Sequence, residues 1–345
     1  GTGAHAEPVR ARGAAQREAA EGCHATRVGR RRGVATFSGL ALSGPAGPYR
    51  LRMGTGALLP DTSTTITLSA GPVAKLAIAT EPPDTVQNAT VFTSQPAVQL
   101  QDLAGNAVSA SGTAVTVSIA SGGGTLGGTL TVQTDENELA TFNNLTITGT
   151  VGPCTLASGA GALTGVTSGA VNVVAGAPST VALNAGNGQA ALAGAAVAIA
   201  PSVVVRDVSG NPVSGVSITF ATAPGSGSVT PATPVLTNGS GVGAATAWTL
   251  GTTAGTQTLT ATTTPDLSGS PVSFTATALV GAATTIAKFS GDNLSGQVGT
   301  TLATPHDVLV SDIHGNPVAG VTVTWAAPLG SGSLNPAVSL TLPAV

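Results

Sequence analysis

The chain has 345 residues, of which 8% are charged and 3% aromatic, with 47 glycines, 22 prolines and a formal net charge of −3. This composition is too apolar for ordinary disorder, lacks the Leu, Glu, Lys and Arg of helical domains, and offers no polybasic surface for nucleic acid or anionic lipid. Many β-branched residues separated by Gly and Pro predict an all-β protein of short strands, in roughly two to three domains.

Residues 1–32 differ from the rest of the chain. They hold seven of its twelve Lys and Arg residues and show no alternating apolar pattern, so we expect no stable fold there. Three interpretations are open: a basic tail for acidic partners, a linker, or a repeat translated in a shifted reading frame. We favour the shifted frame, because one repeat later, at residues 106–137, the sequence has the strand pattern that this segment lacks. The nucleotide sequence tests this hypothesis.

Three sequence features recur at a fixed step of 105 residues. An Asp-x-x-Gly-Asn turn begins at Asp102, Asp207 and Asp312. A glycine that we interpret as a junction between modules recurs at Gly71, Gly176 and Gly281, and the segment ATFSGL at 35–40 matches ATFNNL at 140–145. One step held at so many positions predicts copies of a single module, joined head to tail.

The step divides the chain into five predicted parts. They are an unstructured segment at 1–32, the C-terminal half of an immunoglobulin-like repeat at 33–71, complete repeats at 72–176 and 177–281, and the N-terminal part of a further repeat at 282–345. Because the chain does not begin with Met and ends inside a repeat, we expect a fragment of a longer protein, in which the missing signal peptide says nothing about location.

A module of about 100 residues has the size of an immunoglobulin-like sandwich, which is built from some seven short alternating strands. In VSITF (216–220), the alternation places Val216, Ile218 and Phe220 on one face, and VTVTW (321–325) repeats the pattern. Residues 256–262 and 272–278 are predicted closing strands. The apolar run at 190–205 contains a proline and is shorter than the roughly 20 residues of a membrane helix, so we predict a strand there and no membrane span.

The Asp-x-x-Gly-Asn turn has a structural interpretation. The Asp accepts backbone N–H bonds at the end of a strand, while Gly and Asn take the positive φ that a tight hairpin needs. A calcium site is the alternative, but calcium requires six to eight oxygen ligands and each motif supplies one carboxylate. The sequence therefore favours the turn.

Longer stretches resemble bacterial Ig-like domains of the Big-1 type, found in invasin and intimin. These are VVVRDVSGNPVSGVSITFATAPGSGSV at 203–229, GVGAATAWTLGTTAGTQTLTAT at 241–262 and GSPVSFTATA at 269–278. Residues 72–176, with GGGTLGG and ATFNNLTITG, resemble a related variant, and the resemblance extends over about 33–345. It implies a secreted or surface-displayed tandem array in a bacterium, often within adhesins or large exoproteins, and it transfers no catalytic residue.

A search for chemistry gives no catalytic, cofactor-binding or metal-binding residue, so we predict that the chain is not an enzyme. Cys23 and Cys154 lack the partners of a disulfide or metal site, and Cys154 is interpreted as a strand residue. His306 and His314 flank the third turn motif and are interpreted as loop residues. The glycines at 121–128 are not followed by the Lys-[Ser/Thr] ending of a phosphate loop.

Two tryptophans could stack on sugars or lie in cores. Trp325 replaces Phe220 at an inward strand position, and Trp248 occupies a neighbouring strand, so we predict a core position for both.

Together with the resemblance, these observations predict a non-enzymatic structural spacer, a fragment of a bacterial surface or secreted Ig-like repeat protein with an adhesin-like role in cell adhesion. The alternative is an accessory spacer or carbohydrate-binding portion of a secreted enzyme. Expected partners are a surface ligand of unknown identity or neighbouring repeats of the chain, with no nucleic acid and no direct membrane insertion. Each added module of ten-residue strands would extend the array by about 35 Å. The two half repeats should be the least stable parts, and they are able to complete each other.

Overall fold

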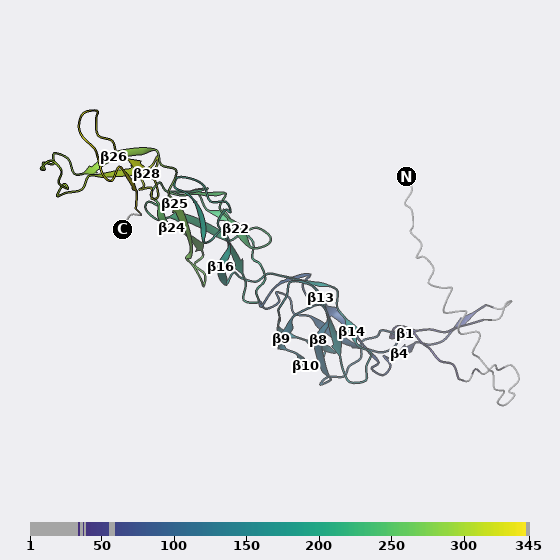
Figure 1. Cartoon of the computed structure of the whole chain (residues 1–345). Coiled ribbons are helices and arrows are strands. Elements are labelled where there is room, and N and C mark those ends of the chain that lie inside the picture. The colour runs from purple at the N-terminus through teal and green to yellow at the C-terminus, as the bar shows by residue number, and fades with distance from the viewer. Residues whose placement is uncertain (1–33, 35–36, 38, 55–58, 343–345) are drawn as a thin grey trace, which may run out of the picture.

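The computed structural model describes residues 34, 37, 39–54 and 59–342, and the hypotheses about residues 1–32 fall outside them. The described residues form strands, turns and loops, with no helix among them. In Figure 1 they make an elongated series of small β-sandwiches, with β1 (Gly47–Tyr49) toward one end and β26 (Thr285–Ser290) toward the other. The fold is therefore all-β, with immunoglobulin-like sandwiches in a linear array and a partial sandwich at each end, as predicted.

The first complete sandwich lies between residues 75 and 174. Its strands are β5 (Lys75–Thr80), β6 (Thr85–Gln87), β7 (Ala97–Gln101), β8 (Ala114–Ser121), β9 (Thr125–Thr129), β10 (Thr131–Gln133), β11 (Leu139–Thr141), β12 (Asn143–Thr148), β13 (Gly152–Gly159), β14 (Val166–Thr167) and β15 (Val171–Val174). One sheet has the order β10-β8-β13-β15-β6, with β14 beside β13, and β11-β7-β5 and β12-β9 form the other ladders. The β15–β6 pair is parallel and the other pairs are antiparallel.

The core of this sandwich follows from strand alternation. In β8, Val115 and Val117 point inward and their neighbours outward, and Cys154 and Leu156 do the same in β13. Opposite them lie the buried side chains of β7 and β12, including Leu100. The buried cluster runs from Leu76 to Val173 in sequence.

The second complete sandwich lies between residues 180 and 279. Its strands are β16 (Thr180–Ala185), β17 (Gln189–Leu192), β18 (Ser202–Arg206), β19 (Ser217–Thr222), β20 (Ser228–Thr230), β21 (Val235–Leu236), β22 (Val242–Ala244), β23 (Ala247–Thr249), β24 (Gly255–Thr264) and β25 (Val272–Leu279). The main sheet has the order β17-β25-β24-β19-β21, and β16-β18-β22 and β20-β23 form the other ladders. The closing strands predicted at 256–262 and 272–278 are β24 and β25.

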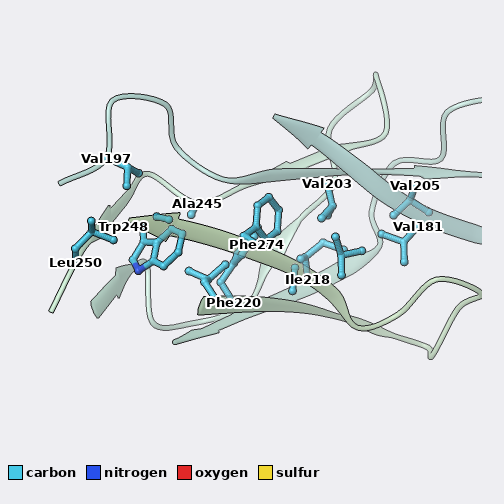
Figure 2. Packing of buried hydrophobic residues seen from close by; sticks show 14 of the residues in the cluster. Val181, Val197, Val203, Val205, Ile218, Phe220, Ala245, Trp248, Leu250 and Phe274 are labelled. Carbon is cyan, nitrogen blue, oxygen red and sulfur yellow. The ribbon is translucent and has the colours of Figure 1, made fainter. Parts of the chain in front are cut away.

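The second core confirms the predicted facing of VSITF, because Val216, Ile218 and Phe220 are all buried. Figure 2 shows Phe220, Trp248 and Phe274 within this core, with the rings of Phe220 and Phe274 6.4 Å apart. The apolar run at 190–205 contributes to strands β17 and β18. In the described part of the chain, no helix combines the length and the apolarity needed to cross a bilayer.

Short strand pairs stand at both ends. At the N-terminal end, β1 pairs with β4 (Ile66–Leu68) and β2 (Arg52–Met53) with β3 (Asp61–Thr62). At the C-terminal end, β26 pairs with β27 (Asp307–Ser311) and β28 (Thr322–Thr324) with β29 (Val338–Leu340). The N-terminal pairs bury little, since none of the described residues from 34 to 71 is buried. In the C-terminal pairs, Val310 of β27 and Val323 of β28 are buried.

The two buried clusters lie on either side of Gly176 in sequence. Ala175, directly before this glycine, already packs against the second cluster. The division of the chain at Gly71, Gly176 and Gly281 stays a prediction.

Candidate functional site

The Asp-x-x-Gly-Asn turn forms the same local structure at each of its three positions. In the second copy, Oδ1 of Asp207 accepts the N–H groups of Ser209 and Asn211, both at 2.9 Å. Gly210 has φ +84°, which only glycine adopts without strain. The asparagine does not have a positive φ in any copy. The expectation that the Asn takes a positive φ in a tight hairpin was therefore wrong. The Asn contributes through its side chain.

The second carboxylate oxygen of each Asp binds a distant glycine. The N–H groups of Gly71, Gly176 and Gly281 donate to Oδ2 of the Asp that lies 31 residues later, at 2.8, 2.9 and 2.9 Å. The turn and the glycine were predicted separately from the repeat step, and the structure shows that they belong to one site. We call each set of glycine, Asp and Asn a junction clasp; the three clasps are Gly71/Asp102/Asn106, Gly176/Asp207/Asn211 and Gly281/Asp312/Asn316.

The asparagine of each clasp reaches a loop in the module before its own, which at the middle clasp is the loop between β12 and β13. Asn211 Nδ2 donates to the carbonyl of Gly149 at 2.8 Å, and its Oδ1 accepts the N–H of Val151 at 3.3 Å. The same two bonds join Asn106 to the backbone of Gly44 and Ala46, and Asn316 to that of Thr252 and Ala254. Because an amide carries both a donor and an acceptor, it can pair with a backbone as a neighbouring strand does. Asp cannot replace it in this role.

Within each clasp the Asn also binds the Asp, because Nδ2 donates to Asp Oδ2 at 2.8 Å in the first clasp and 2.9 Å in the other two. All three Asp side chains are buried, as are Asn211 and Asn316. No buried side-chain polar atom among the described residues lacks a hydrogen-bond partner. The buried polar side-chain atoms of the clasps thus find their hydrogen-bond partners within the protein.

The middle clasp has an additional residue, Asn88. Its Nδ2 donates to Asp207 Oδ2 at 2.8 Å and to Ser209 Oγ at 2.9 Å, and its Oδ1 accepts the N–H of Gly149 at 2.7 Å. Asn88 is 2% exposed. One repeat later the corresponding residue is Ala193, so this contact is specific to one junction. Sequence reasoning missed Asn88, because an Asn in a loop gives no sign of a partner 119 residues away.

Hydrogen bonds keep the clasp carboxylates ionised. The amide of Asn106 and the N–H of Gly71 lower the pKa of Asp102 to about 2. Burial raises the pKa of Asp207, but hydrogen bonds from Asn211, Gly176 and Asn88 outweigh it, and the net pKa is below the ordinary value. Asp312 behaves in the same way, with donors from Asn316 and Gly281. Each clasp therefore places one buried negative charge at the end of a sandwich.

The residues considered as candidates for catalysis, phosphate binding or metal binding lie apart from one another. Cys154 is 1% exposed, and burial raises the pKa of its thiol, which disfavours the reactive thiolate. His314 lies against Gly194 of the preceding repeat, where a Cβ would come within 2.9 Å of its Nε2. The glycines at 121–128 lead into strand β9, and not into a helix. The described residues contain no group of three or more His, Cys, Asp or Glu side chains placed to hold a metal ion.

The two tryptophans have different environments. Trp248 is fully buried and donates its indole N–H to the carbonyl of Ser226 at 3.0 Å, so its ring face is not available to a sugar. Trp325 was also predicted in a core, but it is only half-buried and lines a groove of about 360 Å³. The prediction for Trp325 was wrong because the described residues of the partial sandwich cover its strand face only in part.

Neither family models nor the sequences of curated proteins give a match to the chain. Among solved structures, it is similar to FdeC, an Escherichia coli adhesin, with 19% identity and a TM-score of 0.38, over 66% of this chain and 74% of that one. It is similar to InvD of Yersinia pseudotuberculosis, with 20% identity and a TM-score of 0.40, over 72% and 73%. The S-layer protein SbsC matches at 16% identity and a TM-score of 0.30, over 76% of this chain and 36% of that one. Similarity at this level transfers no function to the chain.

Proposed function

We propose that the chain is a non-enzymatic spacer from a bacterial surface or secreted Ig-like repeat protein with an adhesin-like role. In this function the repeats extend the protein, and the junction clasps hold neighbouring repeats in line. The observation that carries the proposal is the threefold recurrence of the clasp, in which the glycine always lies 31 residues before the Asp. The Big-1-like sequence stretches support the bacterial surface context.

The clasps are suited to alignment because they join two sandwiches through fixed backbone atoms. A flexible linker alone leaves the angle between modules free, whereas two hydrogen bonds from one planar amide also fix orientation. Two such neutral bonds contribute about 1–3 kcal/mol. That is enough to favour one arrangement over a freely jointed chain, while leaving each sandwich to fold around its own core.

Small-angle X-ray scattering of the full chain tests the alignment. We expect the variant with Asn106→Ala, Asn211→Ala and Asn316→Ala to show a shorter average end-to-end dimension and a broader distance distribution than the wild type. Asn238→Ala is the matched control, since Asn238 accepts two N–H bonds in a turn inside one repeat. Identical scattering from the triple variant and the wild type would contradict an aligning role.

The surface location has a separate test. Antibodies raised against the chain should label intact cells of the producing bacterium, and protease added outside should remove the label. A label that appears only after the cells are opened would contradict the location. Loss of attachment to a host surface on deletion of the gene would support the adhesin-like role, and unchanged attachment would contradict it.

A further inference from the structure

The middle junction, at Gly176, has a second connection beside its clasp. Asn88 of the preceding sandwich donates from Nδ2 to Asp207 Oδ2 at 2.8 Å and to Ser209 Oγ at 2.9 Å. With the two bonds of Asn211, four hydrogen bonds between described residues join the two complete sandwiches. The bond to the buried Asp207 carboxylate is charge-assisted, and such bonds are stronger than those between neutral groups.

The third junction, at Gly281, has the clasp without this second connection. Among the described residues, two hydrogen bonds cross it, and both join the amide of Asn316 to the backbone of Thr252 and Ala254. A chain held at this junction by one planar side chain has fewer fixed points than a chain held by two side chains.

The difference comes from side chains and not from the path of the backbone. Ala193 stands at the position of Asn88, one repeat later. Its N–H donates to the carbonyl of Leu279, as the N–H of Asn88 donates to that of Val174, 105 residues earlier. The turn is thus the same in both sandwiches, and only the first carries a side chain that reaches across the junction.

The turn on the other side of the junction differs in the same way. His314 stands at the position of Ser209, and each residue donates its main-chain N–H to Oδ1 of the clasp Asp. The exposed His314 ring lies beside Gly194, where a Cβ would come within 2.9 Å of its Nε2. The pair Asn88 and Ser209 is therefore replaced by Ala193 and an imidazole that packs on a glycine.

The junction glycines have different neighbours as well. A Cβ at Gly176 would lie 2.6 Å from the carbonyl oxygen of Asn88, in the preceding sandwich. The atoms nearest to a Cβ at Gly281 belong to Asp312, which lies in the same module as the strands that follow this glycine. The preceding turn thus packs directly on the middle glycine, whereas the third glycine has its closest neighbours on one side.

The loop that each clasp binds is positioned by a buried amide. In the first sandwich this is Asn88, whose Oδ1 accepts the N–H of Gly149 at 2.7 Å. In the second it is Gln257, which is 4% exposed and bonds to the backbone of Gly251 and Thr253. The bonds of Gln257 lie within its own sandwich, whereas Asn88 links the loop to the next sandwich.

The comparison covers corresponding residues at both junctions. The groups of the second sandwich that bond to the first lie within residues 176–211. The corresponding residues 281–316 all belong to the described part of the chain. The contrast between the junctions therefore arises from described residues on both sides of each.

We propose that Asn88 locks the middle junction, so that the two complete sandwiches move as one rigid pair and bending is concentrated at the third junction. This inference rests on the aligning role proposed for the clasps, and it adds that the alignment differs in stiffness along the chain. A hinge is a short segment that absorbs the rotation between two packed bodies. The third junction has this character, and the middle junction transmits rotation from one sandwich to the next.

Distances between pairs of spin labels on the full chain test the proposal. Thr80, Ala185 and Ser290 are the last residues of β5, β16 and β26, share one position of the repeat and are exposed. In a Cys23→Ser background, Thr80→Cys with Ala185→Cys spans the middle junction, and Ala185→Cys with Ser290→Cys spans the third. Electron–electron double resonance should give a narrow distance distribution for the first pair and a broader one for the second.

Two variants assign the difference to Asn88. Asn88→Ala should broaden the distribution across the middle junction to about the width seen across the third, and leave the third unchanged. Ala193→Asn combined with His314→Ser should narrow the distribution across the third junction. Gln95→Ala is the matched control, since the amide of Gln95 bonds to Phe92 and Leu145 inside the first sandwich, and it should leave both distributions unchanged.

The outcomes separate this proposal from the aligning role of the clasps. Equally narrow distributions across both junctions would overturn the difference in stiffness and leave the aligning role intact, whereas broad distributions across both would overturn the two together. An unchanged middle junction in Asn88→Ala, or an unchanged third junction in the double variant, would overturn the assignment to Asn88. Equal broadening by Gln95→Ala would do the same, because it would trace the effect to a loosened sandwich.

Discussion

Asn211 donates a hydrogen bond of 2.8 Å to the carbonyl of Gly149, 62 residues earlier and in the preceding sandwich. Through this bond, a turn that belongs to one module holds the loop of the module before it.

Acid should weaken the first clasp. The pKa of Asp102 is about 2 in the folded protein and about 3.9 in an unfolded chain. Because the folded value is the lower one, the stabilisation is fully present above about pH 5 and is lost as the pH falls toward 2. Urea unfolding of the wild type and of Asp102→Asn, followed by circular dichroism from pH 6 to pH 2, measures this. The two curves should converge in acid, and a constant difference between them would contradict the assignment.

Asn88→Ala should destabilise the middle junction by about 1–3 kcal/mol. The substitution removes a donor from Asp207 and Ser209 and leaves the N–H of Gly149 without its acceptor. Calorimetry of the full chain measures the loss. Gln133→Ala, on an exposed position of β10, is the control and should change the stability by less than about 0.5 kcal/mol. A loss no greater than that of the control would show that the buried contact is unimportant.

The three junction glycines should differ in their tolerance of alanine. A Cβ at Gly176 would lie 2.6 Å from the carbonyl oxygen of Asn88, whereas the nearest atoms to a Cβ at Gly71 and Gly281 are 3.5 and 3.4 Å away. We expect Gly176→Ala to cost about 1–3 kcal/mol through overpacking, and the other two alanine variants to be well tolerated. Thermal unfolding of the three variants provides the comparison. Equal effects at all three positions would contradict the described packing.

Trp248→Ala should be among the most damaging single changes. Trp248 is fully buried in the second core, and truncation of a buried aromatic side chain costs about 3–5 kcal/mol. Trp325→Ala removes the same side chain from a half-buried position and should cost less than about 1.5 kcal/mol. Urea unfolding of both variants tests the contrast. A similar loss for the two would mean that Trp325 also lies in a well-packed core.

Hydrogen exchange should separate the ends from the centre. The amides of β24 lie between two strands over the second core, whereas β26 is exposed along its whole length. We expect the amides of β26 to exchange faster than those of β24 by several orders of magnitude. Uniformly slow exchange in β26 and β24 would contradict the view that the ends are the least stable parts.

The strands and their facing could be predicted from the sequence because alternation is a local property. In VSITF, the spacing of Val216, Ile218 and Phe220 already determines which residues share a face. The facing of Trp325 follows the same rule, but its burial does not, since burial depends on a second layer contributed by other residues. A local pattern thus predicts on which face of a strand a side chain lies, whereas the packing of a second layer decides how exposed that side chain is.

The junction clasps could be predicted only in part. The repeat step identified Gly176, Asp207 and Asn211 as recurring residues, and the Asp was correctly expected to accept backbone N–H groups. The contact of Asn211 with Gly149 was not foreseen, because a polar side chain in a turn has the same local signal whether it binds its own loop or a neighbour's. The constant separation between the glycine and the Asp was the one signal of a shared site.

The clasp asparagines bind only main-chain atoms of the preceding loop. The acceptor carbonyl belongs to Gly44, Gly149 and Thr252 at the three positions, so the contact does not depend on which side chain that loop carries. As far as the clasp is concerned, modules with divergent sequences remain compatible neighbours when each keeps its own glycine, Asp and Asn; the side-chain contact of Asn88 is an addition at the middle junction. A gene could therefore gain, lose or reorder whole modules by recombination without redesigning the surfaces where they meet.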